Sequence, residues 1–135
     1  MPRLSRLCVL AVLTAVLTGC PPAVHVILFN QTAESLVVVV WGNEYPVAAR
    51  ESGRFPLSET ITVRSSKGRY EYVFPAALRY DHPGPYIEFR FPGGEMVKME
   101  IRADYAIYIL PVAAPAPGPT PYPQREGFPV RPRAS

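Results

Sequence analysis

Residues 24–110 consist of short runs rich in Val, Ile, Tyr and Phe that alternate with turn residues, and this alternation most constrains the fold. Strands favour β-branched and aromatic side chains, whereas Gly, Pro, Asn and Asp interrupt them. No stretch of this region has the apolar spacing of a convincing helix. We therefore predict an all-β domain with strands at residues 24–30, 36–41, 44–48, 53–56, 60–65, 69–74, 86–91, 95–102 and 105–110.

The run LVVVVW at residues 36–41 is apolar on both faces, which predicts a central strand. The other runs mostly alternate apolar and polar residues, as half-buried antiparallel strands do. Many short strands at this spacing favour an antiparallel β-sandwich that is immunoglobulin-like only in a loose architectural sense. The Cys…Trp…Cys pattern of true immunoglobulin domains is absent from the sequence.

The hairpin over residues 60–74 has a register that side-chain pairing predicts. If its turn closes on Lys67-Gly68, the opposite pairs are Ile61 with Phe74, Val63 with Tyr72, and Arg64 with Glu71. A slip of two residues would place Arg64 opposite Arg69, and like charges directly opposite each other are unfavourable. In this hairpin we also expect one shared face for Ile61, Val63, Tyr70, Tyr72 and Phe74.

Side-chain pairing also predicts the register of the hairpin over residues 86–102. A three-residue loop, Pro92-Gly93-Gly94, has glycines available for positive φ. This loop predicts that Phe89 pairs with Val97, Ile87 with Met99, and Glu88 with Lys98. Loops of two or four residues would set apolar side chains against charges.

Residues 111–135 differ sharply in composition, because they hold eight prolines. Proline supplies no ladder donor, and few large apolar side chains remain here to build a core. We therefore predict a disordered tail with polyproline-II character. Its three arginines, Arg125, Arg131 and Arg133, are candidate contacts for an anionic cell wall or a protein partner.

Residues 1–19 have the layout of a secretory signal peptide. Arg3 and Arg6 form a basic start, and the apolar run from Leu7 to Leu17 follows. A membrane-spanning helix needs about 20 apolar residues, so this run is too short to remain as a permanent anchor. The segment is therefore expected to be removed.

The residues Leu17-Thr18-Gly19-Cys20 resemble the lipobox of bacterial lipoproteins, in which an apolar residue and two small residues precede an obligatory cysteine. The resemblance implies that the Cys20 thiol takes a diacylglyceryl group, that the chain is cut before Cys20, and that the new amino group is often acylated. Two or three acyl chains give a stable membrane anchor. Lipidation also accounts for the lone mature thiol, because Cys8 is removed with the signal peptide and no internal disulfide is possible.

Residues 20–23 form only a short linker before the first predicted strand. Pro21 follows Cys20 where, in enterobacterial lipoproteins, an Asp favours retention in the inner membrane. The resemblance therefore implies the outer membrane in a host that has two membranes. Residues 21–23 reach about 10 Å at most, so we expect the domain to sit close against the membrane face.

The sequence argues against an enzyme, a metal site and a cofactor. His25 and His82 are the only histidines, and no Cys/His cluster has metal-ligand spacing. Ser52 lies outside any G-x-S-x-G motif, and no nucleotide fingerprint is present. Residues 24–110 carry 9 basic and 10 acidic residues, without a basic stripe, so nucleic acid is not an expected partner.

Binding is the remaining class of function. The loop YDHPGPY brings together Tyr80, His82 and Tyr86, and Trp41 ends the central strand. Aromatic side chains beside polar groups can stack on sugars or hold a peptide, although the same residues can simply cover the sandwich edge. Our first interpretation is a non-enzymatic envelope lipoprotein that serves as a structural or protein-interaction module. The alternative is a carbohydrate or peptidoglycan binder that uses these aromatics, and the third interpretation is an envelope hydrolase.

Overall fold

The computed structural model describes residues 24–75, 87–90, 94–111 and 124–133. These residues form nine β-strands and no helix, so the predicted all-β class is confirmed. Within the same ranges, no helix is long and apolar enough to cross a membrane. The predicted lipobox and the predicted aromatic loop at residues 80–86 lie outside the described residues.

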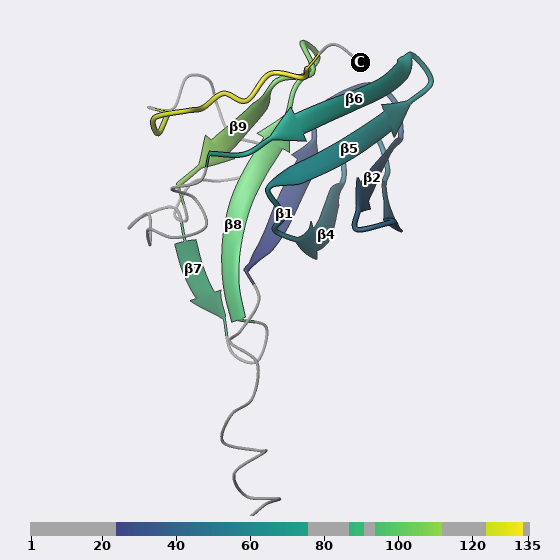
Figure 1. Ribbon diagram of the computed structural model, residues 1–135. Helices are drawn as coiled ribbons and strands as arrows, with labels where there is room; N and C mark the ends of the chain where they lie inside the picture. Colours follow the sequence, from purple (N-terminus) through teal and green to yellow (C-terminus); the bar gives the residue numbers. More distant parts are fainter. Residues whose placement is uncertain (1–23, 76–86, 91–93, 112–123, 134–135) are drawn as a thin grey trace, which may run out of the picture.

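Two sheets pack face to face as the predicted β-sandwich (Figure 1). The first sheet contains β1 (His25–Asn30), β4 (Ser52–Pro56), β7 (Ile87–Arg90), β8 (Gly94–Ile101) and β9 (Ile107–Leu110). Its order is β4-β1-β8-β7, and β9 also pairs with β8. β1 and β8 run parallel, whereas the other pairs of this sheet are antiparallel.

The second sheet is antiparallel throughout. It contains β2 (Leu36–Val40), β3 (Asn43–Val47), β5 (Thr60–Ser65) and β6 (Gly68–Val73), in the order β3-β2-β5-β6. β2 is an interior strand, as its run of valines predicted. Its residues Val38 and Val40 are buried in the core, whereas Val37 and Val39 are half-buried on the outer face.

The core lies between the two sheets and is formed by alternate residues of most strands. Its members from the first sheet include Val26, Leu28, Phe55, Val97, Met99, Ile101, Ile107 and Ile109. Its members from the second sheet include Leu36, Val38, Val40, Val47, Ile61, Val63 and Tyr72. Each of these side chains is at most 1 % exposed, so the sandwich is tightly closed between its sheets.

The predicted register of the hairpin over residues 60–74 is wrong by two residues. The observed pairs are Ile61 with Tyr72, Thr62 with Glu71, Val63 with Tyr70, Arg64 with Arg69, and Ser65 with Gly68. The turn therefore closes on Ser66-Lys67. The shared face is nevertheless as predicted, because a slip of two residues keeps every side chain on its own side of the sheet.

Contacts outside this hairpin explain the observed register. Arg64 forms an ion pair with Glu44 of β3, which offsets the expected repulsion between Arg64 and Arg69. The Glu34 carboxylate accepts hydrogen bonds from the backbone N–H and the hydroxyl of Ser66, and these bonds hold the turn. Neither partner belongs to the hairpin.

The predicted register of the second hairpin is also wrong by two residues. The observed pairs are Ile87 with Val97, Glu88 with Met96, Phe89 with Glu95, and Arg90 with Gly94. Three residues still separate the paired strands. The physical reason lies in β9, because Lys98 and Met99 pair with Leu110 and Ile109. β7 must therefore pair with the earlier half of β8.

The expectation of a fully disordered tail is wrong for residues 124–133. Val130 and Ile107 exchange two backbone hydrogen bonds of 2.8 Å, and the Arg133 N–H donates to the Glu71 carbonyl at 2.8 Å. Phe128 is 9 % exposed and stacks against Phe74. The segment thus crosses from the edge of β9 to the edge of β6 (yellow in Figure 1).

This tail segment is ordered because edge strands offer unpaired backbone groups. Pro129 and Pro132 lack an N–H, but Val130 and Arg133 next to them keep theirs and use them. Gln124 adds a side-chain substitute for a strand: its amide accepts from the Ile109 N–H at 3.0 Å and donates to the Ile109 carbonyl at 3.1 Å.

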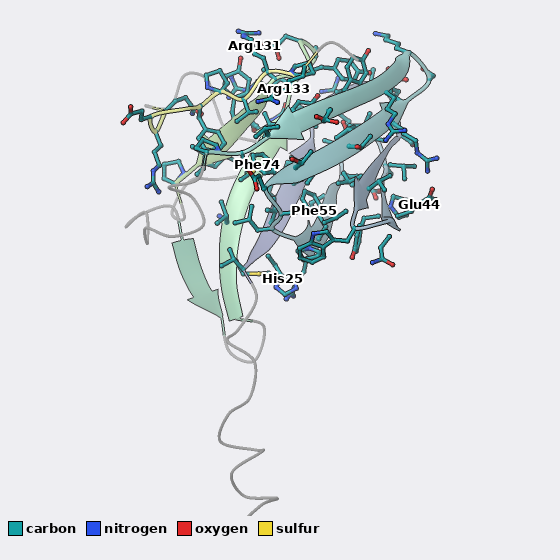
Figure 2. The ribbon with its side chains drawn as sticks, in the orientation of Figure 1. His25, Glu44, Phe55, Phe74, Arg131 and Arg133 are labelled. Carbon is teal, nitrogen blue, oxygen red and sulfur yellow. The ribbon has the colours of Figure 1, made fainter. Side chains whose placement is uncertain are left out.

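The two ends of the sandwich carry different features. The N-terminal end holds Val24, whose carbonyl accepts a 2.8 Å hydrogen bond from Leu57, and the turn Trp41-Gly42 between β2 and β3. The opposite, distal end holds the loops at residues 31–35, 48–51 and 102–106 and the turn Ser66-Lys67. Figure 2 shows His25, the first residue of β1, far from Arg131 and Arg133.

Candidate functional site

Asn30 organises the loops of the distal end. Its side chain is buried, and its amide nitrogen donates to the carbonyls of Glu34 at 2.8 Å, Val47 at 3.2 Å and Ala48 at 3.2 Å. Its carbonyl oxygen accepts the Thr32 N–H at 2.9 Å and the Thr32 hydroxyl at 2.6 Å. One buried amide therefore shapes the loop after β1 and attaches it to the end of β3.

Glu34 stands at the centre of the distal end. Its carboxylate accepts hydrogen bonds from Ser66 and from the Tyr105 hydroxyl, and the Lys67 ammonium lies 4.0 Å from it. The hydrogen bond from the Ser66 side chain, followed by that from Tyr105, lowers the pKa of Glu34 below its ordinary value. The carboxylate is therefore ionised at neutral pH and connects three separate loops.

Tyr105 forms the floor of this cluster. Its backbone is left-handed, with φ of 60°, and its side chain is 7 % exposed. Its ring centroid lies 4.6 Å from that of Tyr70, and the Lys67 ammonium stands 5.7 Å above the ring. Burial, and then the hydrogen bond to Glu34, raise the pKa of the Tyr105 phenol.

These residues line a cavity of about 290 Å³ that opens at the distal end. Its lining comes from three loops and consists of Thr32, Ala33, Glu34, Ser66, Lys67, Ala103 and Tyr105. A pocket of this size is at the lower end of the range for small-ligand sites. Its carboxylate, ammonium and hydroxyl groups suit a polar, hydrogen-bonding group such as a partner's side chain.

The same geometry offers little to hydrolysis. Ser66 donates its hydroxyl proton to Glu34, which resembles the contact between a nucleophile and its base. A general base works best with a pKa near the working pH, however, and the pKa of Glu34 is lowered away from neutrality. The arrangement is that of an ionised carboxylate holding loops together.

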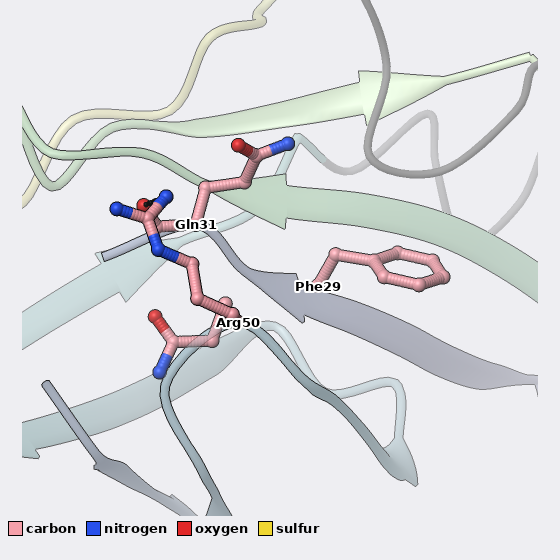
Figure 3. A pocket seen from close by; sticks show the side chains of 4 residues that line it. Phe29, Gln31 and Arg50 are labelled. Atoms are coloured by element: carbon pink, nitrogen blue, oxygen red, sulfur yellow. Dashed lines mark hydrogen bonds between the residues drawn. The ribbon is translucent and has the colours of Figure 1, made fainter. Parts of the chain in front are cut away.

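A second, smaller cavity lies beside the end of β1 (Figure 3). Its volume is about 80 Å³, and its lining residues are Phe29, Asn30, Gln31 and Arg50. The Arg50 guanidinium donates to the Gln31 carbonyl at 2.8 Å, and the Arg50 backbone is left-handed, with φ of 64°. This space suits a few water molecules better than a ligand.

A buried acid lies next to this second cavity, on the outer face of the first sheet. Glu100 of β8 is fully buried, and its carboxylate accepts hydrogen bonds from Gln31 at 3.0 Å and from Arg102. Arg102 in turn lies 4.0 Å from the centroid of the Tyr108 ring. A buried carboxylate needs partners of this kind, so the network has a structural role and no ligand is needed to account for it.

The arginines predicted to contact a cell wall are partly engaged within the molecule. Arg131 lies 3.7 Å from the carboxylate of Asp104, and its side chain remains 66 % exposed. Arg133 is exposed, although its backbone binds β6. Arg125 is half-buried, and its Nη1 is buried without a hydrogen-bond partner among the described residues. Of these three tail arginines, Arg131 and Arg133 are therefore the two that are exposed.

Trp41 is the one member of the predicted aromatic site that the structure places. It lies in the β2–β3 turn at the N-terminal end and is 70 % exposed. Tyr80, His82 and Tyr86, which complete the predicted site, lie outside the described residues, as does Cys20. Trp41 is at the opposite end from the cavity of the distal end.

The sequence did not reveal the distal cluster. Glu34, Ser66 and Tyr105 come from three loops and are brought together only by the pairing of the strands. The one local signal was an acidic residue in the short loop between two apolar runs. An acidic residue in such a loop is usually solvated, so no role was predicted for it.

Comparisons with models of protein families, with curated proteins and with solved structures found no match to this chain. In the part of the chain that the structure describes, no group of three or more His, Cys, Asp or Glu side chains is placed to hold a metal ion. A function is therefore inferred from the geometry of the N-terminal and distal ends of the sandwich.

Proposed function

We propose that the protein is a lipid-anchored, non-enzymatic lipoprotein of the bacterial cell envelope that serves as a structural or protein-interaction module. The observation that carries the proposal is the separation of the two ends of the sandwich. Only three residues separate the lipobox cysteine, Cys20, from Val24, and Val24 is fixed at the N-terminal end. The distal end, with its polar cavity, then faces away from the membrane.

The chemistry of the distal end supports binding. Loops held by a rigid scaffold are where proteins most often place binding residues. Here Asn30 and Glu34 fix the loops from within, while Ala33 and Lys67 remain exposed at the cavity. A preformed surface of this kind lowers the cost of ordering on binding.

Membrane attachment is tested by replacing the lipobox cysteine. Cys20→Ser should leave an unprocessed precursor that takes up no radioactive fatty acid. Cys8→Ser is the matched control, because that thiol lies in the segment to be removed, and it should be processed and labelled normally. Labelling of Cys20→Ser would refute lipidation at this residue. Density fractionation of the labelled protein tests the outer-membrane assignment, which is based on Pro21.

The interaction role is tested at the distal end. Ala33→Arg places a bulky cation in the mouth of the cavity. Asn43→Arg introduces the same side chain beside the turn at the N-terminal end. We expect proteins cross-linked to the wild type in intact cells to be lost from Ala33→Arg and retained by Asn43→Arg. Equal cross-linking by both variants would argue against a distal binding site.

Carbohydrate or peptidoglycan binding is the alternative, and exposed Trp41 is the observation that favours it. On the lipoprotein model, however, Trp41 is at the end nearest the membrane. The retention of the protein by purified cell wall, compared between the wild type and Trp41→Asn, distinguishes this alternative.

A further inference from the structure

Trp41 is exposed in a way that its surroundings do not explain. It is the only tryptophan of the chain, and among the described residues it is the only large apolar side chain that is exposed, at 70 %. A single exposed apolar residue is ordinary on a protein surface. Its backbone and its position supply the further observations.

The backbone at Trp41 is unfavourable for a bulky residue. Val40 pairs with Asn43, so Trp41 and Gly42 form a two-residue hairpin turn. Both have positive φ, 49° for Trp41 and 79° for Gly42, which is the type I′ pattern that strongly favours Asn-Gly. A tryptophan in the first position is strained, and such strain is concentrated at functional sites.

The position of Trp41 indicates what the indole contacts. The turn lies at the N-terminal end of the sandwich, where Leu57 holds Val24. This step rests on the proposed lipidation of Cys20. Residues 21–23 span about 10 Å at most, so that end of the sandwich must lie against the bilayer. The exposed indole and the acyl chains are then on the same side of the domain.

We propose that Trp41 inserts into the headgroup region of the bilayer that holds the lipidated Cys20. Tryptophan is enriched at membrane–water interfaces, because its ring is apolar while its N–H can donate a hydrogen bond to a polar group. A second contact beside the lipid anchor restricts the tilt of the domain. The distal end is thereby held facing away from the membrane.

Fluorescence tests this proposal directly, because Trp41 is the only indole in the protein. The full mature protein is purified from membranes, its acylation is measured by mass spectrometry, and it is reconstituted into phosphatidylcholine vesicles. We expect a blue-shifted emission in vesicles, and a loss of emission when the acyl chains of the lipid carry bromine. Protection from acrylamide in vesicles should accompany the shift.

The matched control moves the indole to the opposite end of the sandwich. In the double variant Trp41→Asn/Lys67→Trp, the single tryptophan occupies the distal turn, where Lys67 is 68 % exposed. Its emission should be insensitive to brominated lipid. If the acylated wild type is not quenched, or if soluble peptidoglycan fragments and not vesicles shift its emission, the proposal is overturned. An unacylated Cys20 would instead remove the proposed function and this inference together.

Discussion

The hydroxyl of Tyr72 donates a hydrogen bond of 2.7 Å to the backbone carbonyl of Tyr105. Tyr72 belongs to β6 in the second sheet and is fully buried, whereas Tyr105 lies in the loop that leads into β9 of the first sheet. The side chain of Tyr105 in turn donates to Glu34. A polar contact inside the core is thus continuous with the cluster at the distal end.

Removing the Tyr72 hydroxyl should destabilise the protein measurably. Tyr72→Phe keeps the ring but leaves the Tyr105 carbonyl unpaired, and an unsatisfied buried group costs about 1–3 kcal/mol. Urea unfolding at neutral pH measures the change in free energy. Tyr45→Phe is the control, because Tyr45 is only half-buried, and its free energy of unfolding should change little. Equal effects of the two substitutions would contradict the role of the bond.

The same tyrosine predicts a loss of stability in alkali. Burial, as the main cause, raises the pKa of Tyr72 far above its ordinary value of 10.0. Because the pKa is raised in the folded state, the contribution of the protonated Tyr72 phenol to stability is fully present below pH 10. That contribution decreases as the pH rises above 10, where the phenol of the unfolded chain ionises. The free energy of unfolding should therefore fall with increasing pH in this range. In Tyr72→Phe the fall should be shallower, and an unchanged slope would contradict this account.

Glu34 predicts the opposite behaviour in acid. Its pKa is lowered, chiefly by the Ser66 hydroxyl, so its contribution is present above the ordinary value of 4.5 and lost as the pH falls further. Glu34→Gln should flatten the acid side of the stability curve. It should also speed hydrogen exchange at the Ser66 amide, which donates to the carboxylate at 3.2 Å.

The control for Glu34 is a carboxylate in an exposed ion pair. Glu44→Gln removes the partner of Arg64, but the Glu44 side chain is 58 % exposed, so the loss should be within about 1 kcal/mol. The exchange rate of the Ser66 amide should be unchanged in this variant. Equal exchange rates in Glu34→Gln and the wild type would mean that the carboxylate does not hold the turn.

Local pattern was sufficient to predict the strands. A run such as LVVVV leaves little choice, because β-branched side chains fit a pleated surface and their alternation separates core from solvent. All nine predicted runs overlap observed strands, and the faces of residues 60–74 were assigned correctly. These properties depend on neighbours within a few residues.

Register and site depended on partners distant in the sequence. The pairing of Arg64 with Arg69 is tolerated because of Glu44, and β7 is displaced along β8 because β9 pairs with Lys98. Glu34 and Tyr105 are likewise brought together by the order in which the strands pair, and local sequence pattern does not predict that order. The tail was misjudged for a related reason, since proline content describes the segment and not the open edges of β6 and β9.

That tail provides the last prediction, which reverses the expectation from composition. Phe128 is 9 % exposed and its ring centroid lies 6.5 Å from that of Phe74, while Val130 is bonded to β9. Phe128→Ala should therefore reduce the free energy of unfolding by about 3 kcal/mol, as truncation of a buried phenylalanine does.

Gly127→Ala should also destabilise the protein, because φ at Gly127 is 86° and a Cβ there would lie 2.5 Å from Pro75 Cγ. Arg131→Ala, which removes only an exposed ion pair, should change the free energy by less than about 1 kcal/mol. Urea unfolding of the three variants measures this order. If Phe128→Ala is as stable as the wild type, residues 124–133 contribute nothing to the sandwich and the tail is a spacer after all.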